Sequence, residues 1–293
     1  MLFYFAYFCS MVKQEAIFNI KSNTEFENLA LDVFKFQFKN NPVYRSFCDL
    51  LYKHPSDIIR IEDIPFLPIQ FFKTHHIVSS LLPPKKIFTS SGTTGSITSK
   101  HLVTDVKLYE RSYLEGFKHF YNAIEGYVVL ALLPSYLERD GSSLVYMAND
   151  LILKSKQPES GFYLNNIEDL AKTLNNLEAR GQKTLLIGVS FALLDVVEKF
   201  QFSLKHTIVM ETGGMKGRRK EMIRQELHEI LKTGFGVTDI HSEYGMTELL
   251  SQAYSCGDGL FNCPPWMRVI TRDTEEAQSL ILNKTGGINI VDL

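Results

Sequence analysis

The strongest constraint on the fold comes from a set of apolar runs, each followed directly by polar residues. Residues Tyr127–Leu133 form a continuous apolar run, which is typical of a strand buried on both faces of a sheet. Three further runs repeat the arrangement. They are Thr184–Val189 before Ser190, Thr207–Met210 before Glu211-Thr212-Gly213-Gly214, and Val237–His241 before Glu243-Tyr244-Gly245-Met246-Thr247-Glu248.

Helical patterns separate the later runs. Residues Phe191–Phe200 form one pattern, and Arg218–Lys232 form a clearer one, which Gly234 is placed to end. Alternating strands and helices predict parallel βαβ units, and hence an α/β fold with mostly parallel sheets flanked by helices. Ligands of such sheets bind beyond the carboxyl ends of the strands, so we expect the polar residues to converge on one crevice. The apolar face expected for the second helix is Met222, Ile223, Leu227, Ile230 and Leu231.

A loop rich in hydroxyls and glycine, Ser90-Ser91-Gly92-Thr93-Thr94-Gly95, is suited to wrap a polyphosphate. Glycines let successive backbone N–H groups turn inward around an anion, and the hydroxyls donate to phosphoryl oxygens. A Walker A loop is excluded, since Gly-x-x-x-x-Gly-Lys-Ser/Thr does not occur in this stretch. The nearest cation is Lys100, beside His101. A polar turn joining two strands has a similar composition, so the loop alone does not decide a function.

The end of the last run carries an aromatic ring, a hydroxyl and a carboxylate within one turn. Tyr244 is suited to stack on a base, Thr247 to donate to a phosphate, and Glu248 to bind Mg²⁺ beside substrate phosphates. Gly213-Gly214 allows a flat base to approach the backbone. Each has an ordinary structural alternative, since tyrosines after strands usually pack and Gly-Gly pairs usually form turns. The basic residues Lys216, Arg218, Arg219 and Lys220 are typical of a solvated helix face.

These motifs resemble those of the adenylate-forming superfamily, which includes acyl- and aryl-CoA synthetases, luciferases and peptide-synthetase adenylation domains. The likeness runs from about residue 13 to the end of the chain. It is closest to LuxE-type acyl-protein synthetases, with PaaK-type phenylacetate–CoA ligases next. Besides the Ser91–Gly95 and Tyr244–Glu248 motifs, the segments that carry it are Ile64–His75, Ser99-Lys100-His101, Glu211–Arg218 and Pro264–Val269.

The resemblance implies a two-step reaction with ATP and Mg²⁺. A carboxylate, in LuxE-type enzymes a fatty acid, attacks the α-phosphate to give acyl-adenylate and pyrophosphate, and the acyl group then passes to a thiol. Such a reaction depends on positioning and charge neutralisation rather than on a protein nucleophile.

The resemblance also implies the roles of individual residues. Lys100, Thr247 and Glu248 are the expected catalytic residues, with Thr247 at the α-phosphate and Glu248 on the metal. The expected nucleotide-binding residues form three groups. Around the β- and γ-phosphates are Ser90, Ser91, Gly92, Thr93, Thr94 and Gly95, and at the adenine are Gly213, Gly214 and Met215. The third group is the run Tyr244, Gly245, Met246 and Thr247, in which Tyr244 would stack on the base.

Two features depart from the superfamily pattern. The usual Pro-Lys-Gly after the phosphate loop is absent, and Ser96–Lys100 brings the lysine later, as in LuxE-like sequences. Superfamily members also continue with a ribose-binding aspartate and a C-terminal lid that carries a catalytic lysine, and LuxE-type proteins carry an acyl-accepting cysteine there; none of these is assigned. We therefore expect an adenylation domain over residues 12–293, truncated before the lid, with residues 1–11 a non-native or disordered start.

Composition sets the remaining bounds. A chain of 293 residues, 45% of them hydrophobic, can bury a substantial core in one large or two intimate domains. The formal charge of −2 and the lack of a basic stripe give no case for nucleic acid. The apolar stretch Leu2–Cys9 is far shorter than the ~20 residues of a membrane span. The cysteines are irregularly spaced, which is typical of reduced thiols in the cytoplasm, and Cys256 and Cys263 near His241 lack the spacing of a zinc site.

Three functions stay open. The leading one is an ATP-dependent, acyl-adenylating enzyme of LuxE type, which acts on a fatty or related acid and passes the acyl group to a partner protein, a second copy of the chain or CoA. A PaaK-type aryl- or acyl-CoA ligase differs in its acid, so fatty-acid- and phenylacetate-dependent pyrophosphate exchange separate the two. The third is a lidless nucleotide- or acyl-binding module that binds ATP without converting it to AMP and pyrophosphate.

Overall fold

The computed structural model describes residues 14–91, 97–134, 141–213, 219, 222–276, 278–281 and 284–293. The chain divides into two compact units. Unit 1 takes the described residues up to Ser112 together with Thr247–Ser251 and Cys263–Leu293, and unit 2 takes Tyr113–Met246 and Gln252–Asn262. The run Tyr244–Glu248 is therefore divided, since Met246 belongs to unit 2 and Thr247 to unit 1.

Unit 2 is built on a six-stranded sheet in the order β4-β3-β5-β6-β7-β8. All neighbouring pairs from β4 to β7 are parallel, and β8 is antiparallel to β7. Every residue of β3 and β5 is buried, as the continuous apolar runs predict. The strands are β3 (Val128–Leu132), β4 (Gly161–Phe162), β5 (Thr184–Val189), β6 (Thr207–Thr212), β7 (His241–Tyr244) and β8 (Ala253–Ser255).

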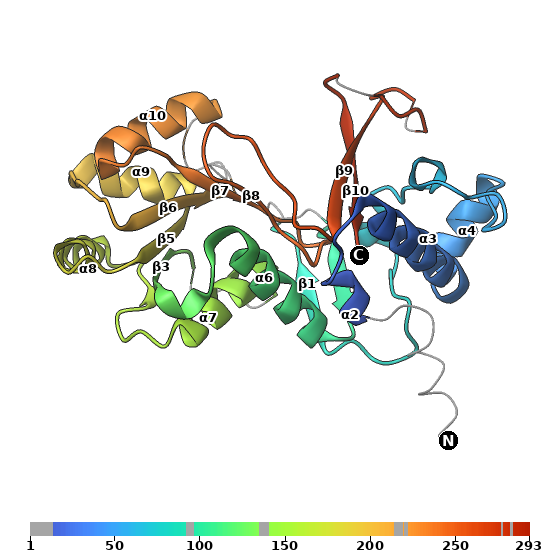
Figure 1. Cartoon of the computed structure of the whole chain (residues 1–293), viewed down its shortest axis with the longest axis horizontal. Coiled ribbons are helices and arrows are strands. Elements are labelled where there is room, and N and C mark those ends of the chain that lie inside the picture. Colours follow the sequence, from blue (N-terminus) through green and yellow to red (C-terminus); the bar gives the residue numbers. More distant parts are fainter. Residues whose placement is uncertain are drawn as a thin grey trace. The chain divides into compact units, whose positions relative to one another are not determined.

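Helices flank this sheet. Figure 1 shows α9 (Ser190–Lys199) and α10 (Arg224–Phe235) on one side of the sheet and α7 (Ser143–Ser155) on the other. Helix α9 packs on β5 and β6, and α7 packs on β3. The predicted α/β class with a mainly parallel, helix-covered sheet is confirmed. The remaining helices here are α8 (Ile167–Ala179), the short η2 (Ile124–Gly126) and α6 (Val106–Tyr121), which has residues in both units.

The fourth strand begins later than its apolar pattern predicts. We expected Val237–His241, and the strand is His241–Tyr244. Its backbone pairs with Met210–Thr212 of β6, and its buried residues are Ser242 and Glu243. Because these polar residues are buried against polar neighbours, hydrophobicity does not mark the strand.

The expected helix Arg218–Lys232 is also shifted, to Arg224–Phe235. Gly234 does not end it; the left-handed cap is Gly236, with φ of 64°. Gly234 instead lies within the helix, where a Cβ would lie 2.3 Å from Cβ of Val197 on α9. Its lack of a side chain lets the two helices approach closely. Of the expected apolar face, Leu227 and Leu231 are buried, whereas Ile223 and Ile230 are exposed and Met222 and Ile223 precede the helix.

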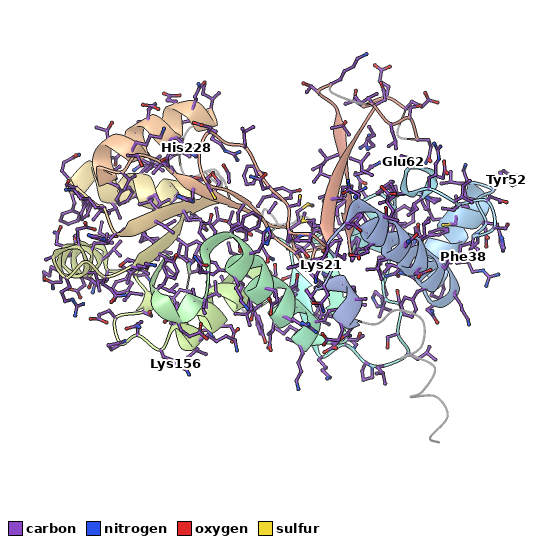
Figure 2. The ribbon with its side chains drawn as sticks, in the orientation of Figure 1. Lys21, Phe38, Tyr52, Glu62, Lys156 and His228 are labelled. Atoms are coloured by element: carbon purple, nitrogen blue, oxygen red, sulfur yellow. The ribbon has the colours of Figure 1, made fainter. Side chains whose placement is uncertain are left out.

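Unit 1 combines helices with two antiparallel strand pairs. Helix α3 (Asn23–Asn40) buries Phe26, Phe34 and Phe38 at the predicted helical spacing, with Leu29 half-buried. Phe38, labelled in Figure 2, belongs to a core cluster with Tyr44 and Cys48 of α4 (Pro42–Leu50). The other elements are α2 (Gln14–Ile17), η1 (Ile61–Asp63), α5 (Phe71–Thr74), β1 (Lys86–Thr89) paired with β2 (Lys100–Val103), and β9 (Met267–Arg272) paired with β10 (Gly287–Asp292). No helix in the described part of the chain is long and apolar enough to cross a bilayer.

The close approach of α10 to α9 predicts that Gly234→Ala destabilises the protein. The added methyl group would overlap Val197, and overpacking of this kind costs about 1–3 kcal/mol of unfolding free energy. Urea unfolding followed by circular dichroism measures the change. Gly126→Ala is the matched control, because no heavy atom lies within 4 Å of the position that its Cβ would take. Equal stability of the two variants would contradict this packing.

Candidate functional site

The β1–β2 hairpin carries the first part of the site in unit 1. Thr89 lies opposite Lys100, and two reciprocal hydrogen bonds close the connection. The N–H of Ser90 donates to the carbonyl oxygen of Ser99 at 3.1 Å, and the N–H of Ser99 donates to Oγ of Ser90 at 2.9 Å. Ser99 is buried, whereas Ser91 and Lys100 are exposed. The first residue of the predicted phosphate loop, Ser90, is therefore held to Ser99; the loop residues Gly92, Thr93, Thr94 and Gly95 lie outside the described residues.

His101 joins this hairpin to the second motif. Its Nδ1 lies 2.9 Å from the carbonyl oxygen of Thr247, which is 146 positions away in the sequence. Because a carbonyl oxygen only accepts, Nδ1 carries the proton. Burial lowers the pKa of His101, against the opposing effects of this hydrogen bond and of the Glu248 charge, so the ring is neutral at pH 7. Two of the segments predicted to form one site thus meet in unit 1.

A polar network holds the other end of the segment Thr247–Ser251. Asp292, at the end of β10, accepts hydrogen bonds from the N–H groups of Leu250 at 2.7 Å and Ser251 at 3.1 Å, and from Oγ of Ser251. The indole N–H of Trp266 donates to Oγ of Ser251 at 3.0 Å. The segment is therefore fixed at both ends. Asp292 holds the backbone here, a role that its place in an apolar strand did not indicate.

The carboxylate of Glu248 is left available by this arrangement. Glu248 is half-buried in the turn that follows Thr247. Among the described residues, no hydrogen bond or ion pair engages its side chain. No group of three His, Cys, Asp or Glu side chains in that same part of the chain is arranged as a metal site. A single free carboxylate suits a hard cation that takes its other ligands from a substrate.

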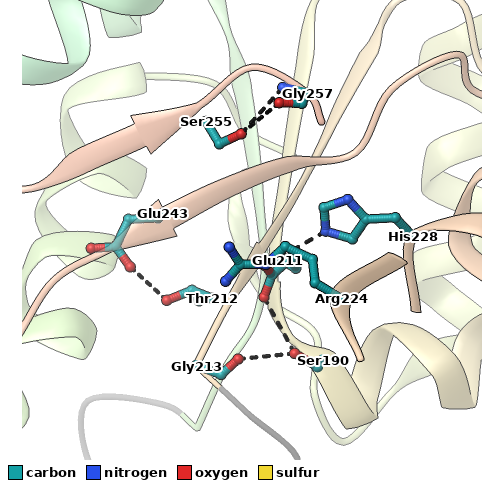
Figure 3. Close-up of polar contacts among 9 residues, drawn as sticks. All are labelled: Ser190, Glu211, Thr212, Gly213, Arg224, His228, Glu243, Ser255 and Gly257. Carbon is teal, nitrogen blue, oxygen red and sulfur yellow. Dashed lines mark hydrogen bonds and ion pairs between the residues drawn. The ribbon is translucent and has the colours of Figure 1, made fainter. Parts of the chain in front are cut away.

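The ends of β6 and β7 carry the second part of the site, in unit 2. Their parallel register places Thr212 opposite Glu243 and Glu211 opposite Ser242. Because side chains alternate along a strand, Thr212 and Glu243 share one face of the sheet and Glu211 lies on the other. Oγ1 of Thr212 donates to Oε2 of Glu243 at 2.5 Å (Figure 3). Neither glutamate had been assigned a role from the sequence.

Glu243 is buried against the backbone of the predicted motif. Burial raises its pKa to about 7; the hydrogen bond from Thr212 opposes the shift, and the nearby Glu211 adds to it. A Cβ at Gly245 would lie 2.5 Å from Oε1 of Glu243. Residue 245 must therefore be small for Glu243 to keep this place, which supplies a packing reason for the glycine in Tyr244-Gly245-Met246.

Glu211 stands at the centre of a cluster on the α9 and α10 side. Oγ of Ser190, the first residue of α9, lies 2.9 Å from the carbonyl oxygen of Gly213 and 3.3 Å from Oε2 of Glu211. Nε of Arg224 and Nε2 of His228 lie 3.5 Å and 3.7 Å from Oε1 of Glu211 (Figure 3). Gly213 has a φ of 69°, which favours glycine. Ser190 and Glu211 together fix the point where the chain leaves β6.

The other predicted residues of unit 2 are placed only in part. Tyr244 donates from its hydroxyl to Sδ of Met246 at 3.1 Å, and its ring meets that of Phe261 edge-on with centroids 6.1 Å apart. Gly214 and Met215 lie outside the described residues. The structure thus brings Ser90, Ser91, Lys100, Thr247 and Glu248 into unit 1, and Gly213, Tyr244, Gly245 and Met246 into unit 2.

Comparison with known proteins bears on this arrangement. Residues 15–126 match the family described as "Acyl-protein synthetase, LuxE". The resemblance to LuxE-type proteins is confirmed over this segment. The matched segment contains the hairpin and His101 but not the Tyr244–Glu248 run. No curated protein sequence matches the chain.

Solved structures show the adenylate-forming fold. The ATP-bound structure of MatB from Rhodopseudomonas palustris matches with a TM-score of 0.50 and 16% identity, over 70% of this chain and 39% of that one. The structure of 2-hydroxyisobutyryl-CoA ligase in complex with 2-HIB-AMP matches with a TM-score of 0.52 and 11% identity, over 90% of this chain and 58% of that one. The chain therefore spans less than two thirds of the length of either enzyme.

The environment of Glu243 predicts a pH-dependent effect of Glu243→Gln. The pKa of this carboxyl is about 7 in the folded protein, against an ordinary glutamate value of 4.5. Between these values the folded state holds a proton that the unfolded chain has lost. Stability therefore falls as the pH rises through this window, by up to about 1.4 kcal/mol per pH unit, and falls no further above it. Glutamine keeps the neutral form, so its advantage over the native residue grows through the window and then levels off.

Urea unfolding of both proteins from about pH 5 to about pH 8 measures this difference. The exposed Glu226, changed to glutamine, is the control for loss of a carboxylate at the surface. A stability difference for Glu243→Gln that is constant across the range would show that Glu243 ionises normally in the folded protein.

Proposed function

We propose that this chain uses ATP to activate a carboxylic acid as an acyl-adenylate. The observation that carries the proposal is the hydrogen bond from His101 to Thr247, which joins the hydroxyl-rich hairpin to the Thr247–Glu248 turn. The LuxE match and the adenylate-forming fold support it. So do the ligands of the similar proteins, since MatB is ATP-bound and 2-hydroxyisobutyryl-CoA ligase holds 2-HIB-AMP.

The proposed chemistry assigns the phosphates to unit 1. Ser90 and Ser91, with Gly92–Gly95, hold the β- and γ-phosphates through hydroxyl and backbone N–H donors, and Lys100 adds a positive charge. Thr247 donates to the α-phosphate. A carboxylate oxygen of the acid then forms a bond to the α-phosphorus. The bond from that phosphorus to its bridging oxygen breaks, and the electron pair leaves with pyrophosphate.

Magnesium belongs to the same proposal. Glu248 would hold the ion, because its carboxylate is half-buried and engaged by no other group among the described residues. When bound, Mg²⁺ would neutralise part of the charge of the phosphates. The backbone that carries Glu248 is fixed by His101 on one side and by Asp292 on the other. These two contacts therefore hold the carboxylate of Glu248 in place for the ion.

In unit 2, the proposal assigns the adenine to Gly213, Gly214, Met215, Tyr244, Gly245 and Met246. Ser190 and Glu243 act as positioning residues, because Ser190 donates to the backbone at Gly213 and Glu243 abuts Gly245. Glu211 acts through Ser190, whose hydroxyl lies 3.3 Å from its carboxylate. A buried carboxyl that holds a backbone turn limits its freedom before the nucleotide arrives, which lowers the ordering cost of binding.

The acid and the acceptor are proposed from the family match. The matched family is described as an acyl-protein synthetase, and the resemblance to LuxE-type proteins implies a fatty acid, so a fatty acid is the proposed substrate, with a protein or CoA thiol as the acceptor. Cys48, Cys256 and Cys263 are free thiols, in keeping with a reducing compartment such as the cytoplasm.

Acid-dependent conversion of ATP to AMP and pyrophosphate tests the proposed function. We expect AMP to form when a fatty acid is supplied with Mg²⁺, and less with phenylacetate. Preference for phenylacetate would favour an aryl-CoA ligase. Binding of ATP with no AMP formed from any acid would show a binding module and overturn the proposal.

Glu248→Ala tests the site within the same experiment. Loss of the proposed metal ligand should weaken Mg-ATP binding by at least about tenfold, measured by calorimetry, because even a hydrogen bond to a charged group contributes about 1.5–3 kcal/mol. Glu62→Ala removes an exposed glutamate in the same unit and should leave the affinity unchanged. Unchanged affinity of Glu248→Ala would contradict its assigned role.

A further inference from the structure

A basic pocket in unit 1 shares Lys100 with the function proposed above, and its other lining residues have no role there. Its volume is about 310 Å³. It is lined by one short segment that contains α5 and by the segment that leads into β2. The lining residues are Phe72, Lys73, Thr74, His75, His76, Ile97, Thr98 and Lys100. All of them belong to unit 1.

The charge of this pocket is unbalanced. Lys73 and Lys100 both line it, and none of its lining residues in the described part of the chain is acidic. Neither ammonium group forms an ion pair with an acidic side chain in the described ranges. The protein as a whole carries a formal charge of −2, so this concentration of positive charge is local. Cations gathered in a concave site without counter-charges favour binding of an anion.

The neutral groups of the pocket also suit an anion with many oxygens. Thr98 provides a hydroxyl donor, whereas the hydroxyl of Thr74 donates to the carbonyl oxygen of Gln70. The ring of His75 is held by stacking on Phe71, with centroids 4.9 Å apart, and its Nδ1 lies 2.8 Å from Oγ1 of Thr74. A pocket of about 310 Å³ lies at the small end of ligand sites, which favours a compact anion over a whole nucleotide.

The pocket adjoins the loop assigned to the phosphates. Lys100, one of its walls, follows Ser99 directly, and Ser99 is hydrogen-bonded to Ser90 in both directions. On the other side of Lys100, His101 holds Thr247 and meets Phe72 of the pocket edge-on, with ring centroids 5.9 Å apart. An anion in the pocket therefore lies beside the residues that are proposed to position the triphosphate.

We propose that this pocket binds pyrophosphate and so receives the leaving group of acyl-adenylate formation. The inference rests on the proposed function for the source of the anion and on Lys73, His76 and Lys100 for its recognition. Pyrophosphate offers only acceptor oxygens and negative charge, which match ammonium and hydroxyl donors. Charge-assisted hydrogen bonds of this kind are the strong ones.

Calorimetric titration with inorganic pyrophosphate tests the pocket without any turnover. Lys73→Gln should weaken pyrophosphate binding about tenfold, through loss of one charged donor. Lys73→Arg should keep most of the affinity. The matched control is Lys107→Gln, which removes an exposed lysine of the same unit that does not line the pocket. Because Lys73 is exposed, we expect its substitution to leave the melting temperature unchanged. An unchanged melting temperature would show that the variant is folded.

The same variants then separate this inference from the proposed function. If AMP forms in an acid-dependent way, Lys73→Gln should raise the inhibition constant of pyrophosphate by the same factor as its dissociation constant. If Lys73→Gln has the same inhibition constant and the same affinity for pyrophosphate as Lys107→Gln, the assignment of pyrophosphate to the pocket is wrong, and the proposed function is unaffected. Conversely, if Lys73→Gln weakens pyrophosphate binding but the native protein forms no AMP, the pocket is an anion site. The claim that it receives the leaving group of acyl-adenylate formation would then be wrong.

A phosphorylated thiol carrier is the other chemical source of such an anion. Coenzyme A in place of pyrophosphate distinguishes the two. Dependence of pyrophosphate binding on Lys73, with no such dependence for coenzyme A, supports the inference. If only coenzyme A binding responds to Lys73→Gln, the assignment to pyrophosphate is wrong.

Discussion

A hydrogen bond from Nδ1 of His101 to the carbonyl oxygen of Thr247 is the contact on which the rest of the proposed site depends. It joins a hairpin near residue 100 to a turn near residue 247, and both belong to unit 1. A bond of this kind contributes only about 1 kcal/mol, but leaving a buried donor without a partner costs more. Burial also keeps the ring neutral, so Nδ1 has a fixed role as donor. The position of Thr247 and Glu248 follows from this one imidazole and from the carboxylate of Asp292.

The sheet of unit 2 uses its two faces differently at the ends of β6 and β7. Glu243 and Thr212 share one face, where the carboxyl has a pKa raised to about 7 and abuts Gly245. Glu211 lies on the other, where Ser190, Arg224 and His228 surround it. Burial of two carboxyls on neighbouring strands is costly unless each has donors or a proton. The raised pKa of Glu243 and the cationic neighbour of Glu211 show how each is accommodated.

The apolar part of the fold could be predicted from the sequence, because burial on both faces leaves a continuous apolar run. Strands β3 and β5 and helix α9 lie close to their predicted positions. Strand β7 was misplaced because its buried residues, Ser242 and Glu243, are polar, and only their cross-strand partners explain them. The local pattern predicts a helix end at Gly234, whereas this glycine lies inside the helix against Val197, a neighbour that no local pattern reveals.

The same distinction applies to the site. Residue types identified Ser90, Ser91, Thr247 and Glu248 as candidates, since hydroxyls, glycines and a carboxylate have recognisable chemistry. The groups that hold them, His101, Asp292, Ser190 and Glu243, act through tertiary contacts with residues distant in the sequence. Asp292 ends an apolar strand and Ser190 begins a helix, so neither carries a local signal of its role. Roles that depend on a partner far along the chain need the fold.

Affinity cleavage with Fe²⁺ and ATP tests most directly whether the hairpin and the turn bind one nucleotide. Fe²⁺ takes the place of Mg²⁺ on the triphosphate and, with peroxide and ascorbate, cuts the backbone close to the metal. The cuts are mapped by mass spectrometry. The account predicts ATP-dependent cuts both between residues 90 and 101 and around Thr247–Glu248, and their loss when excess Mg-ATP is added. Cuts confined to one of these segments, or cuts that do not require ATP, would contradict it.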